Sequence, residues 1–311
     1  MKKILLIISF LFINQHLLYA TENTIFLKYK INEDLITNYD ILKESKYLTA
    51  LNQEINSISQ EQLFEFSKNS LIREKVKLYE IEKFYQVNYS SSSVESYIDD
   101  FMKKLNINNR SDFQIYLSSY ETSIEEIKKK LIIEMSWNKM ILEIYENRIL
   151  IDKEKISKTL DDLIMKKQNQ KSFELYEIVF TGKNKEDFKN TYEKIILDIE
   201  NLGFEKASII HSISNTASSG GRIGWVNQNQ LSKSFNEELK FLNVGDYTKP
   251  INTAGGSIIL QLKNEKEVSI KNIDKELELS KIISAEKNRQ LNEFSIIHYK
   301  KTENKAYVKE F

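Results

Sequence analysis

Glycine and proline are confined to one short window of this chain. All eight glycines and the single proline lie between Gly182 and Gly256, within 311 residues. Glycine inside a helix costs about 1 kcal/mol relative to alanine, and proline costs about 3 kcal/mol. The long segments that lack both residues are therefore free to form helices, whereas the window must contain the tight turns. The sequence predicts an α+β protein that is mostly helical, with one turn-rich α/β module inserted into it.

Helix-start signals outside the window agree with that prediction. Thr37 with Asp40, and Ser59 with Gln62, have the spacing of a capping box, in which side chains three residues apart satisfy free backbone N–H groups. Apolar residues recur at helical spacing after these signals. The expected helices cover residues 38–51, about 60–85, 92–105, 111–117, 123–148, 152–165 and 273–299.

Residues 24–30 and 306–311 alternate apolar and polar side chains, as short strands do. They lie near opposite ends of the chain. We expect the two strands to pair, so that the C-terminal segment packs back on the N-terminal helices.

The first twenty residues are typical of a secretory signal peptide. Lys2 and Lys3 precede an apolar stretch at 4–13, and Leu18-Tyr-Ala20 matches a cleavage site before Thr21. A helix that spans a bilayer needs about 20 apolar residues. The apolar stretch at 4–13 is shorter than that. The alternative to a cleaved signal peptide is an uncleaved N-terminal anchor. The sequence predicts an exported protein without a permanent membrane anchor.

Charge and composition exclude several classes of function. The chain has 45 basic and 45 acidic residues, and without residues 1–20 it has 43 against 45. Such balance predicts no general attraction to nucleic acid or to anionic membranes. The absence of cysteine excludes disulfides and thiolate chemistry. His211 and His298 lack partners at metal-ligand spacing, and the glycines lack a nucleotide-binding pattern, so we expect no metal and no cofactor.

Ordered motifs within the window resemble the parvulin-type (PpiC-like) prolyl isomerase family. Gly220-Gly-Arg-Ile-Gly-Trp225 is followed by Leu231-x-x-x-Phe235 and then by Gly245-Asp-x-x-x-Pro250. Residues 175–180, 204–212 and 255–262 resemble the first strand, a helix and the last strand of that family. The resemblance covers roughly 173–263 and implies a small antiparallel sheet.

The flanking segments resemble the SurA-like periplasmic chaperone family, with one parvulin-like module. The resemblance rests on residues 35–41, on the order of the helices up to about 170, and on 306–309. It implies a signal peptide at 1–20, a helical chaperone domain at 21–170, a parvulin-like module at 171–264, and a C-terminal helix and strand at 265–311 that complete the helical domain.

The parvulin resemblance implies a proline pocket without the usual polar network. Leu231 and Phe235 occupy the apolar pocket positions, and the alternative for both is ordinary core packing. Glu177 and Ser214 stand where the family has a histidine and a cysteine or aspartate. Ile258 replaces the second histidine. Isomerisation must lower a barrier of about 18–20 kcal/mol, so these replacements predict weak or absent activity.

Two further residues of the module are candidates for a role in binding or catalysis. Trp225 is a candidate for stacking on a peptide near the pocket, with core packing as the alternative. Glu177 would have a raised pKa if it lay desolvated in the site. The alternative is that Glu177 is a half-exposed strand residue without a role in the site.

The resemblance implies an ATP-independent periplasmic chaperone for unfolded exported polypeptides, in particular outer-membrane proteins. We expect clients to lie in a groove between the helical domain and the parvulin-like module. Two alternatives stay open: an active peptidyl-prolyl isomerase that uses Glu177 and Ser214, and an adaptor for one fixed protein partner. Candidate groove aromatics are Phe64, Tyr79, Tyr97, Tyr116, Tyr120 and Tyr145.

Overall fold

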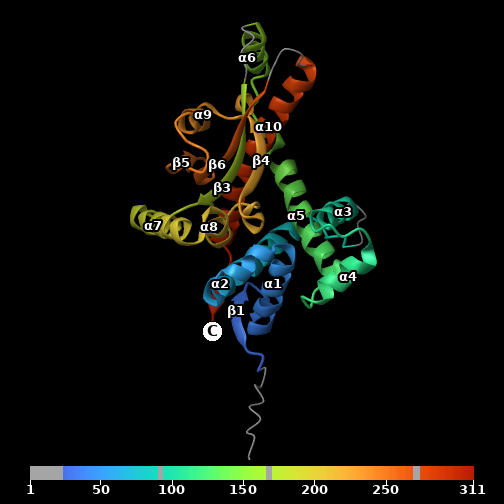
Figure 1. The fold of residues 1–311 in the computed structure, drawn as a ribbon. Coiled ribbons are helices and arrows are strands. Elements are labelled where there is room, and N and C mark those ends of the chain that lie inside the picture. The colour runs from blue at the N-terminus through green and yellow to red at the C-terminus, as the bar shows by residue number, and fades with distance from the viewer. Residues whose placement is uncertain (1–23, 90–93, 166–169, 269–273) are drawn as a thin grey trace, which may run out of the picture.

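The computed structural model describes residues 24–89, 94–165, 170–268 and 274–311. It confirms a mostly helical protein with two small antiparallel sheets (Figure 1). The helices are α1 (Asn38–Leu51), α2 (Gln60–Ile81), α3 (Glu95–Lys104), α4 (Arg110–Ser118), α5 (Ile124–Tyr145), α6 (Lys153–Met165), α7 (Lys185–Leu202), α8 (Phe204–His211), α9 (Lys233–Leu239) and α10 (Lys275–Glu303). The strands are β1 (Leu27–Ile31), β2 (Asp34–Thr37), β3 (Gln170–Phe180), β4 (Arg222–Asn227), β5 (Ile251–Thr253), β6 (Gly256–Val268) and β7 (Val308–Glu310).

Both predicted capping boxes are present. The Thr37 hydroxyl accepts from the Asp40 N–H at 3.1 Å, while Asp40 accepts from the Thr37 N–H at 2.8 Å. Ser59 and Gln62 make the same exchange at the start of α2. These boxes set the starts of α1 and α2 where the sequence predicts them.

Three other predicted helix starts have different outcomes. The predicted start of α4 was wrong by one residue, since the helix begins at Arg110 and not at Ser111. Its cap is Asn109, whose side chain accepts from the Asp112 N–H at 2.8 Å. The starts predicted near residues 92 and 273 lie outside the described residues.

The two ends of the described chain pair in one sheet, with strand order β2-β1-β7. β1 and β7 run antiparallel, with Tyr29 opposite Glu310 and Ile31 opposite Val308. The Tyr29 hydroxyl donates to Glu310 at 2.9 Å. The predicted pairing of the chain ends is confirmed, and Figure 1 shows β1 beside the C-terminus at one end of the molecule.

Helix α10 joins this sheet to the rest of the molecule and packs on α2 and α5. Trp137 of α5 is fully buried, and its indole N–H donates to Ser295 of α10 at 2.8 Å. The ring of Tyr145 stacks on Phe294 at 4.7 Å. The prediction that the C-terminal helix packs on the N-terminal helices is therefore confirmed.

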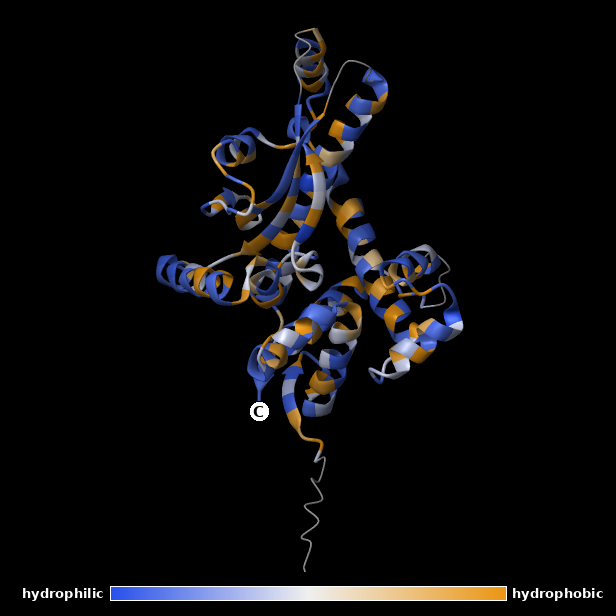
Figure 2. Cartoon of the chain, viewed as in Figure 1, coloured by the Kyte–Doolittle hydropathy of each residue, from blue (hydrophilic) through white to orange (hydrophobic). Residues whose placement is uncertain are grey.

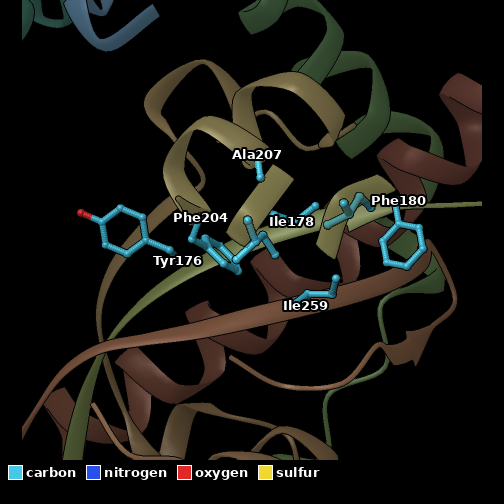
Figure 3. Packing of buried hydrophobic residues seen from close by; sticks show 8 residues of the cluster. Tyr176, Ile178, Phe180, Phe204, Ala207 and Ile259 are labelled. Carbon is cyan, nitrogen blue, oxygen red and sulfur yellow. The ribbon is translucent and has the colours of Figure 1, made fainter. Parts of the chain in front are cut away.

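The parvulin-like module is built on a second sheet with order β4-β3-β6-β5. Its central ladder runs from Gln170 opposite Val268 to Phe180 opposite Ser257. One face packs on α7 and α8 through a cluster that includes Tyr176, Ile178, Phe180, Phe204, Ala207 and Ile259 (Figure 3). The sheet is apolar at its end near α8 and polar at the other end (Figure 2), so β3 and β6 extend beyond the strands predicted from apolar residues.

Direct contacts fix the module to the helical domain. Ile209 of α8 is buried with Leu48, Ile55 and Ile58. The Asn52 side chain donates to the Ser218 carbonyl at 3.2 Å. None of the helices among the described residues combines the length and apolar character that crossing a bilayer requires.

Candidate functional site

A polar cluster forms where the sequence predicts altered catalytic positions. The Ser214 hydroxyl donates to Glu177 Oε1 at 2.5 Å, so the structure brings these two predicted residues together. The Thr216 hydroxyl donates to the same oxygen at 2.9 Å. Sequence reasoning missed Thr216, and its hydroxyl type and position two residues after Ser214 were the available signal.

Backbone contacts hold the cluster in place. The Ile213 N–H donates to the Val179 carbonyl at 2.8 Å, which ties the segment after α8 to β3. The Glu177 N–H donates to the Gly221 carbonyl at 2.8 Å, and the Ser208 hydroxyl donates to the Glu177 carbonyl at 2.9 Å. These hydrogen bonds join β3 to the segments before and after residues 214–216.

The surroundings of the Glu177 carboxyl favour its neutral form. Burial raises the pKa of Glu177, and the hydrogen bonds from Ser214 and Thr216 only partly oppose that shift. The cluster lines a pocket of about 80 Å³ together with Arg73 of α2 and Tyr299 of α10. A carboxyl with a raised pKa can act as a hydrogen-bond donor over a wider pH range than an exposed one.

Helix α10 covers this part of the sheet. Asn292, Ser295 and Ile296 line the same small pocket as Glu177. Gly255 lies close against this helix. A Cβ at Gly255 would lie 3.3 Å from Ile296 Cδ1. A substrate could not reach Glu177 from this side without displacing the helix.

The apolar pocket residues share the sheet face of Glu177. Ile258 lies opposite Val179, and Leu260 lies opposite Glu177, so alternation places Ile258 and Glu177 on the same face. Leu231, Phe235 and Ile258 all pack against the buried cluster of Leu239, Leu260 and Leu262. The Ile258 side chain can neither donate nor accept a hydrogen bond.

Trp225 does not join the pocket. Its neighbour Val226 packs with Leu231 and Phe235, and consecutive strand residues point to opposite faces of a sheet. The Trp225 ring instead lies under the Lys266 ammonium, 4.0 Å from the ring centroid. The register therefore separates Trp225 from the other two predicted peptide-binding residues.

A cavity of about 850 Å³ lies between the helical domain and the module. Helices α1, α2 and α5 form one wall, and α8 with residues 212–218 forms another. Ser214, Arg73 and Tyr299 line both this cavity and the small pocket of Glu177. The predicted groove between the two parts is present, and it adjoins the polar cluster.

One of the six predicted groove aromatics, Tyr97, lines this cavity. Phe64, Tyr116, Tyr120 and Tyr145 pack against core clusters of the helical domain. Tyr79 is exposed but does not line the cavity. Helical spacing identifies the apolar face of a helix but not the element that covers it. The aromatics that the prediction missed are Tyr47, Phe66 and Tyr299.

Paired charges make part of the cavity wall polar. Lys130 lies between Glu44, at 2.7 Å, and Glu74. Burial raises the pKa of Glu44 despite the neighbouring ammonium. Lys77 pairs with Glu134 at 2.6 Å. The cavity therefore offers apolar side chains beside charges whose partners are already in place.

The two histidines of the described chain make structural contacts. His211 Nε2 lies 2.7 Å from Asp198, and His298 lies between Tyr145 and Glu80 at 2.9 and 3.1 Å. Within the described ranges, no group of three or more acidic or histidine side chains could hold a metal ion.

These features define a helical protein in which the strands β1 and β7, near the two ends of the chain, pair with each other. The protein carries one parvulin-like module. Residues 152–264 match the Rotamase family, described as the PPIC-type PPIASE domain. The match begins ahead of residue 171, the predicted start of the module. The chain is related in sequence to SurA chaperones and contains a parvulin-type domain.

Similar proteins match parts of the chain. Chaperone SurA of Pseudomonas fluorescens (strain Pf0-1) is 28% identical over 165 residues, which cover 50% of this chain and 38% of that protein. Periplasmic chaperone PpiD of Haemophilus influenzae is 34% identical over 90 residues, or 29% of this chain and 14% of PpiD. The chain thus spans well under half the length of both relatives.

A solved structure also aligns with most of the chain. It is described among the two SurA-like chaperones PEB4 and Cj1289 of Campylobacter jejuni, and the alignment covers 92% of this chain and 98% of that one. The sequence identity is 14% and the TM-score is 0.37.

We expect Glu177→Gln to stabilise the protein at neutral pH. The folded-state pKa of Glu177 is raised above its ordinary value of 4.5, so its stabilising contribution is full below that value and is lost as pH rises through the folded-state pKa. Glutamine does not ionise and avoids this loss. Urea unfolding between pH 4 and pH 8 should show a gap between variant and wild type that widens with pH. Glu237→Gln on the exposed face of α9 is the control, and a gap independent of pH would contradict the prediction.

Proposed function

We propose that this protein is an ATP-independent chaperone that holds unfolded exported polypeptides in the cavity between its two parts. The observation that carries this proposal is the cavity of about 850 Å³, whose walls come from both the helical domain and the parvulin-like module. The relatives named SurA and PpiD are described as chaperones, PpiD as periplasmic, which supports the same class. Export, with removal of residues 1–20 as a signal peptide, would place the protein in the periplasm.

The size and lining of the cavity suit weak, reversible binding. Binding pockets for small ligands have volumes of about 300–1,000 Å³, so this cavity can enclose a few side chains of an extended segment. Tyr47, Phe66, Tyr97 and Tyr299 offer aromatic contacts. Four of the charged side chains on the wall, Glu44, Glu74, Lys130 and Glu134, are already paired. A client therefore gains little from them and can leave without an energy source. Outer-membrane strands alternate apolar and polar residues and fit such a lining.

The module is proposed to have weak or lost isomerase activity. A catalyst must favour the twisted amide over the planar one. Ile258 supplies no hydrogen bond, and α10 covers one side of the cluster formed by Glu177, Ser214 and Thr216. The Glu177 carboxyl has its hydroxyl partners, Ser214 and Thr216, within the protein rather than at an open proline pocket.

Client binding is tested with one cavity aromatic. Tyr97 lines the cavity and is 54% exposed, so Tyr97→Ser should leave the fold intact. We expect it to weaken binding of an unfolded outer-membrane polypeptide about fivefold or more, as removal of an aromatic anchor does in other interfaces. Fluorescence anisotropy measures the affinity. The matched control is Tyr79→Ser, which removes another exposed tyrosine outside the cavity. Equal affinity in both variants would exclude the cavity as the client site.

Isomerase activity is tested on a proline-containing tetrapeptide. We expect the rate to stay within about twofold of the uncatalysed rate, since the barrier of about 18–20 kcal/mol is not lowered without the polar network. Phe235→Ala should change nothing, and an active parvulin is the positive control. Catalysis that disappears in Phe235→Ala would instead support the alternative of an enzyme that uses Glu177 and Ser214.

The adaptor alternative predicts a different binding profile. A chaperone should bind several unrelated unfolded polypeptides with similar affinity, whereas an adaptor should bind one folded partner. The chaperone predicts that two unrelated unfolded clients compete for the cavity lined by Tyr97, whereas the adaptor predicts no such competition.

A further inference from the structure

Three lysines from opposite ends of the chain meet on one face of the β2-β1-β7 sheet. Lys30 of β1 lies directly opposite Lys309 of β7. The Phe311 N–H donates to the Lys28 carbonyl at 2.9 Å, which continues the β1–β7 ladder and places Lys28 on the face of Lys30, although the pairing of β1 with β2 shifts register between Leu27 and Tyr29. Like charges directly opposite each other on neighbouring strands are destabilising. The fold brings these ammonium groups together although the chain as a whole has balanced charge.

Exposed apolar side chains accompany the lysines. The Lys28 ammonium lies 4.9 Å from the ring centroid of Phe26, and that of Lys309 lies 4.4 Å from that of Phe311. Leu35 of β2 lies opposite Lys30 on the same face. Phe26, Leu35 and Phe311 are 48%, 55% and 54% exposed. We call this set of Phe26, Lys28, Lys30, Leu35, Lys309 and Phe311 the basic–aromatic face.

The neighbouring acids leave this face positive. Glu33 lies in the β1–β2 turn and pairs with Lys30 at 3.4 Å, with an almost fully exposed side chain. Glu310 alternates to the other face, where it accepts from Tyr29. Asp34 pairs with Lys75 of α2 at 3.1 Å. Among the described residues, Lys28 and Lys309 form no ion pair.

We infer that the basic–aromatic face docks on a membrane surface that contains anionic lipids. Lysines are attracted to anionic headgroups, with about 1 kcal/mol gained for each lysine near the surface. Phenylalanine and leucine can enter the boundary between headgroups and acyl chains at the same time. One sheet face offers both kinds of side chain together, and a bilayer surface accepts both. The association is peripheral and reversible.

The same sheet would then separate the membrane from the cavity. Val308 lines the 850 Å³ cavity, and alternation along β7 places its side chain on the face opposite to Lys309. Figure 1 shows β1 and the C-terminus at the end of the molecule away from the larger sheet. Docking through the basic–aromatic face would hold the cavity beside the lipid surface but turned away from it.

Vesicle flotation of the full chain tests this inference. We expect stronger partition onto vesicles containing phosphatidylglycerol than onto phosphatidylcholine vesicles, with a decrease as salt rises. Lys28→Gln and Lys309→Gln should each weaken the anionic partition coefficient about fivefold. Phe26→Ser combined with Phe311→Ser should weaken it further. Residues 1–20 are the same in every variant, so their contribution cancels when variants are compared on the same vesicles.

Matched controls change the same residue types elsewhere on the surface. Lys189→Gln on α7 and Phe241→Ser, both exposed on the parvulin-like module, should leave the partition unchanged. Equal partition onto both vesicle types would overturn the inference, as would equal effects of the control and face variants. Binding to soluble polyglutamate without binding to anionic vesicles would also overturn it, and would assign the face to an acidic protein.

Discussion

Trp137→Ala is expected to lower the free energy of unfolding by about 3–5 kcal/mol, the range for removing a fully buried aromatic side chain. Trp137 has no exposed surface and lies where α5 meets α10. Its indole N–H donates to Ser295, and the ring contacts His298 and Tyr299 edge-on. The variant would leave a cavity and an unpaired hydroxyl at the joint that fixes the C-terminal helix. Urea unfolding followed by circular dichroism measures the loss.

The matched control removes the other tryptophan. Trp225 is 41% exposed on the edge strand β4, so Trp225→Ala should cost less than about 1 kcal/mol, as most surface substitutions do. Equal losses in the two variants would mean that α10 does not pack on α5 as described. A larger loss at Trp225 would contradict its placement outside the pocket and the core.

Gly221→Ala is expected to destabilise the parvulin-like module by about 2–5 kcal/mol, through backbone strain and overpacking together. Gly221 has a φ of +80°, which favours glycine. A Cβ there would lie 2.2 Å from the Glu177 carbonyl oxygen and 2.5 Å from the Ser208 hydroxyl. Relief of these clashes would also weaken the hydrogen bond from the Glu177 N–H to the Gly221 carbonyl. The substitution should therefore disturb the polar cluster as well as stability.

Gly224→Ala separates strain from crowding. Gly224 also has a positive φ, +92°, but nothing lies within 4 Å of the position that its Cβ would take. We expect a cost of about 1–2 kcal/mol from conformation alone. Thermal unfolding of both variants gives the comparison, and hydrogen exchange at the Glu177 amide reports on the cluster. If Gly221→Ala were no worse than Gly224→Ala, the close packing of residues 208, 177 and 221 would be disproved.

The structure brings some of the predicted site residues together and separates others, for reasons that particular residues illustrate. Glu177 and Ser214 meet because ordered motifs place a strand and the end of a helix in a known relation. Thr216 joins them through a turn whose shape depends on contacts with β3. Trp225 was a candidate either for stacking on a peptide near the pocket or for core packing, and strand register places it on the face of the sheet opposite to Leu231. A register shift of one residue is invisible in composition and decides which face a side chain occupies.

The sequence by itself determined the local structure of this protein. The hydroxyls of Thr37 and Ser59 cap the helices that follow them, because a cap needs only residues three positions apart. The confinement of glycine and proline to 182–256 marked the turn-rich module, because these residues act on their own backbone.

Only the tertiary structure decided which surfaces face one another. Tyr97 lines the cavity while Tyr116 does not, although both lie at helical spacing. Lys28 and Lys309 share a sheet face although 280 residues separate them in the sequence. Such meetings depend on strand register and helix packing, which many weak long-range contacts set together. No local pattern contains that information.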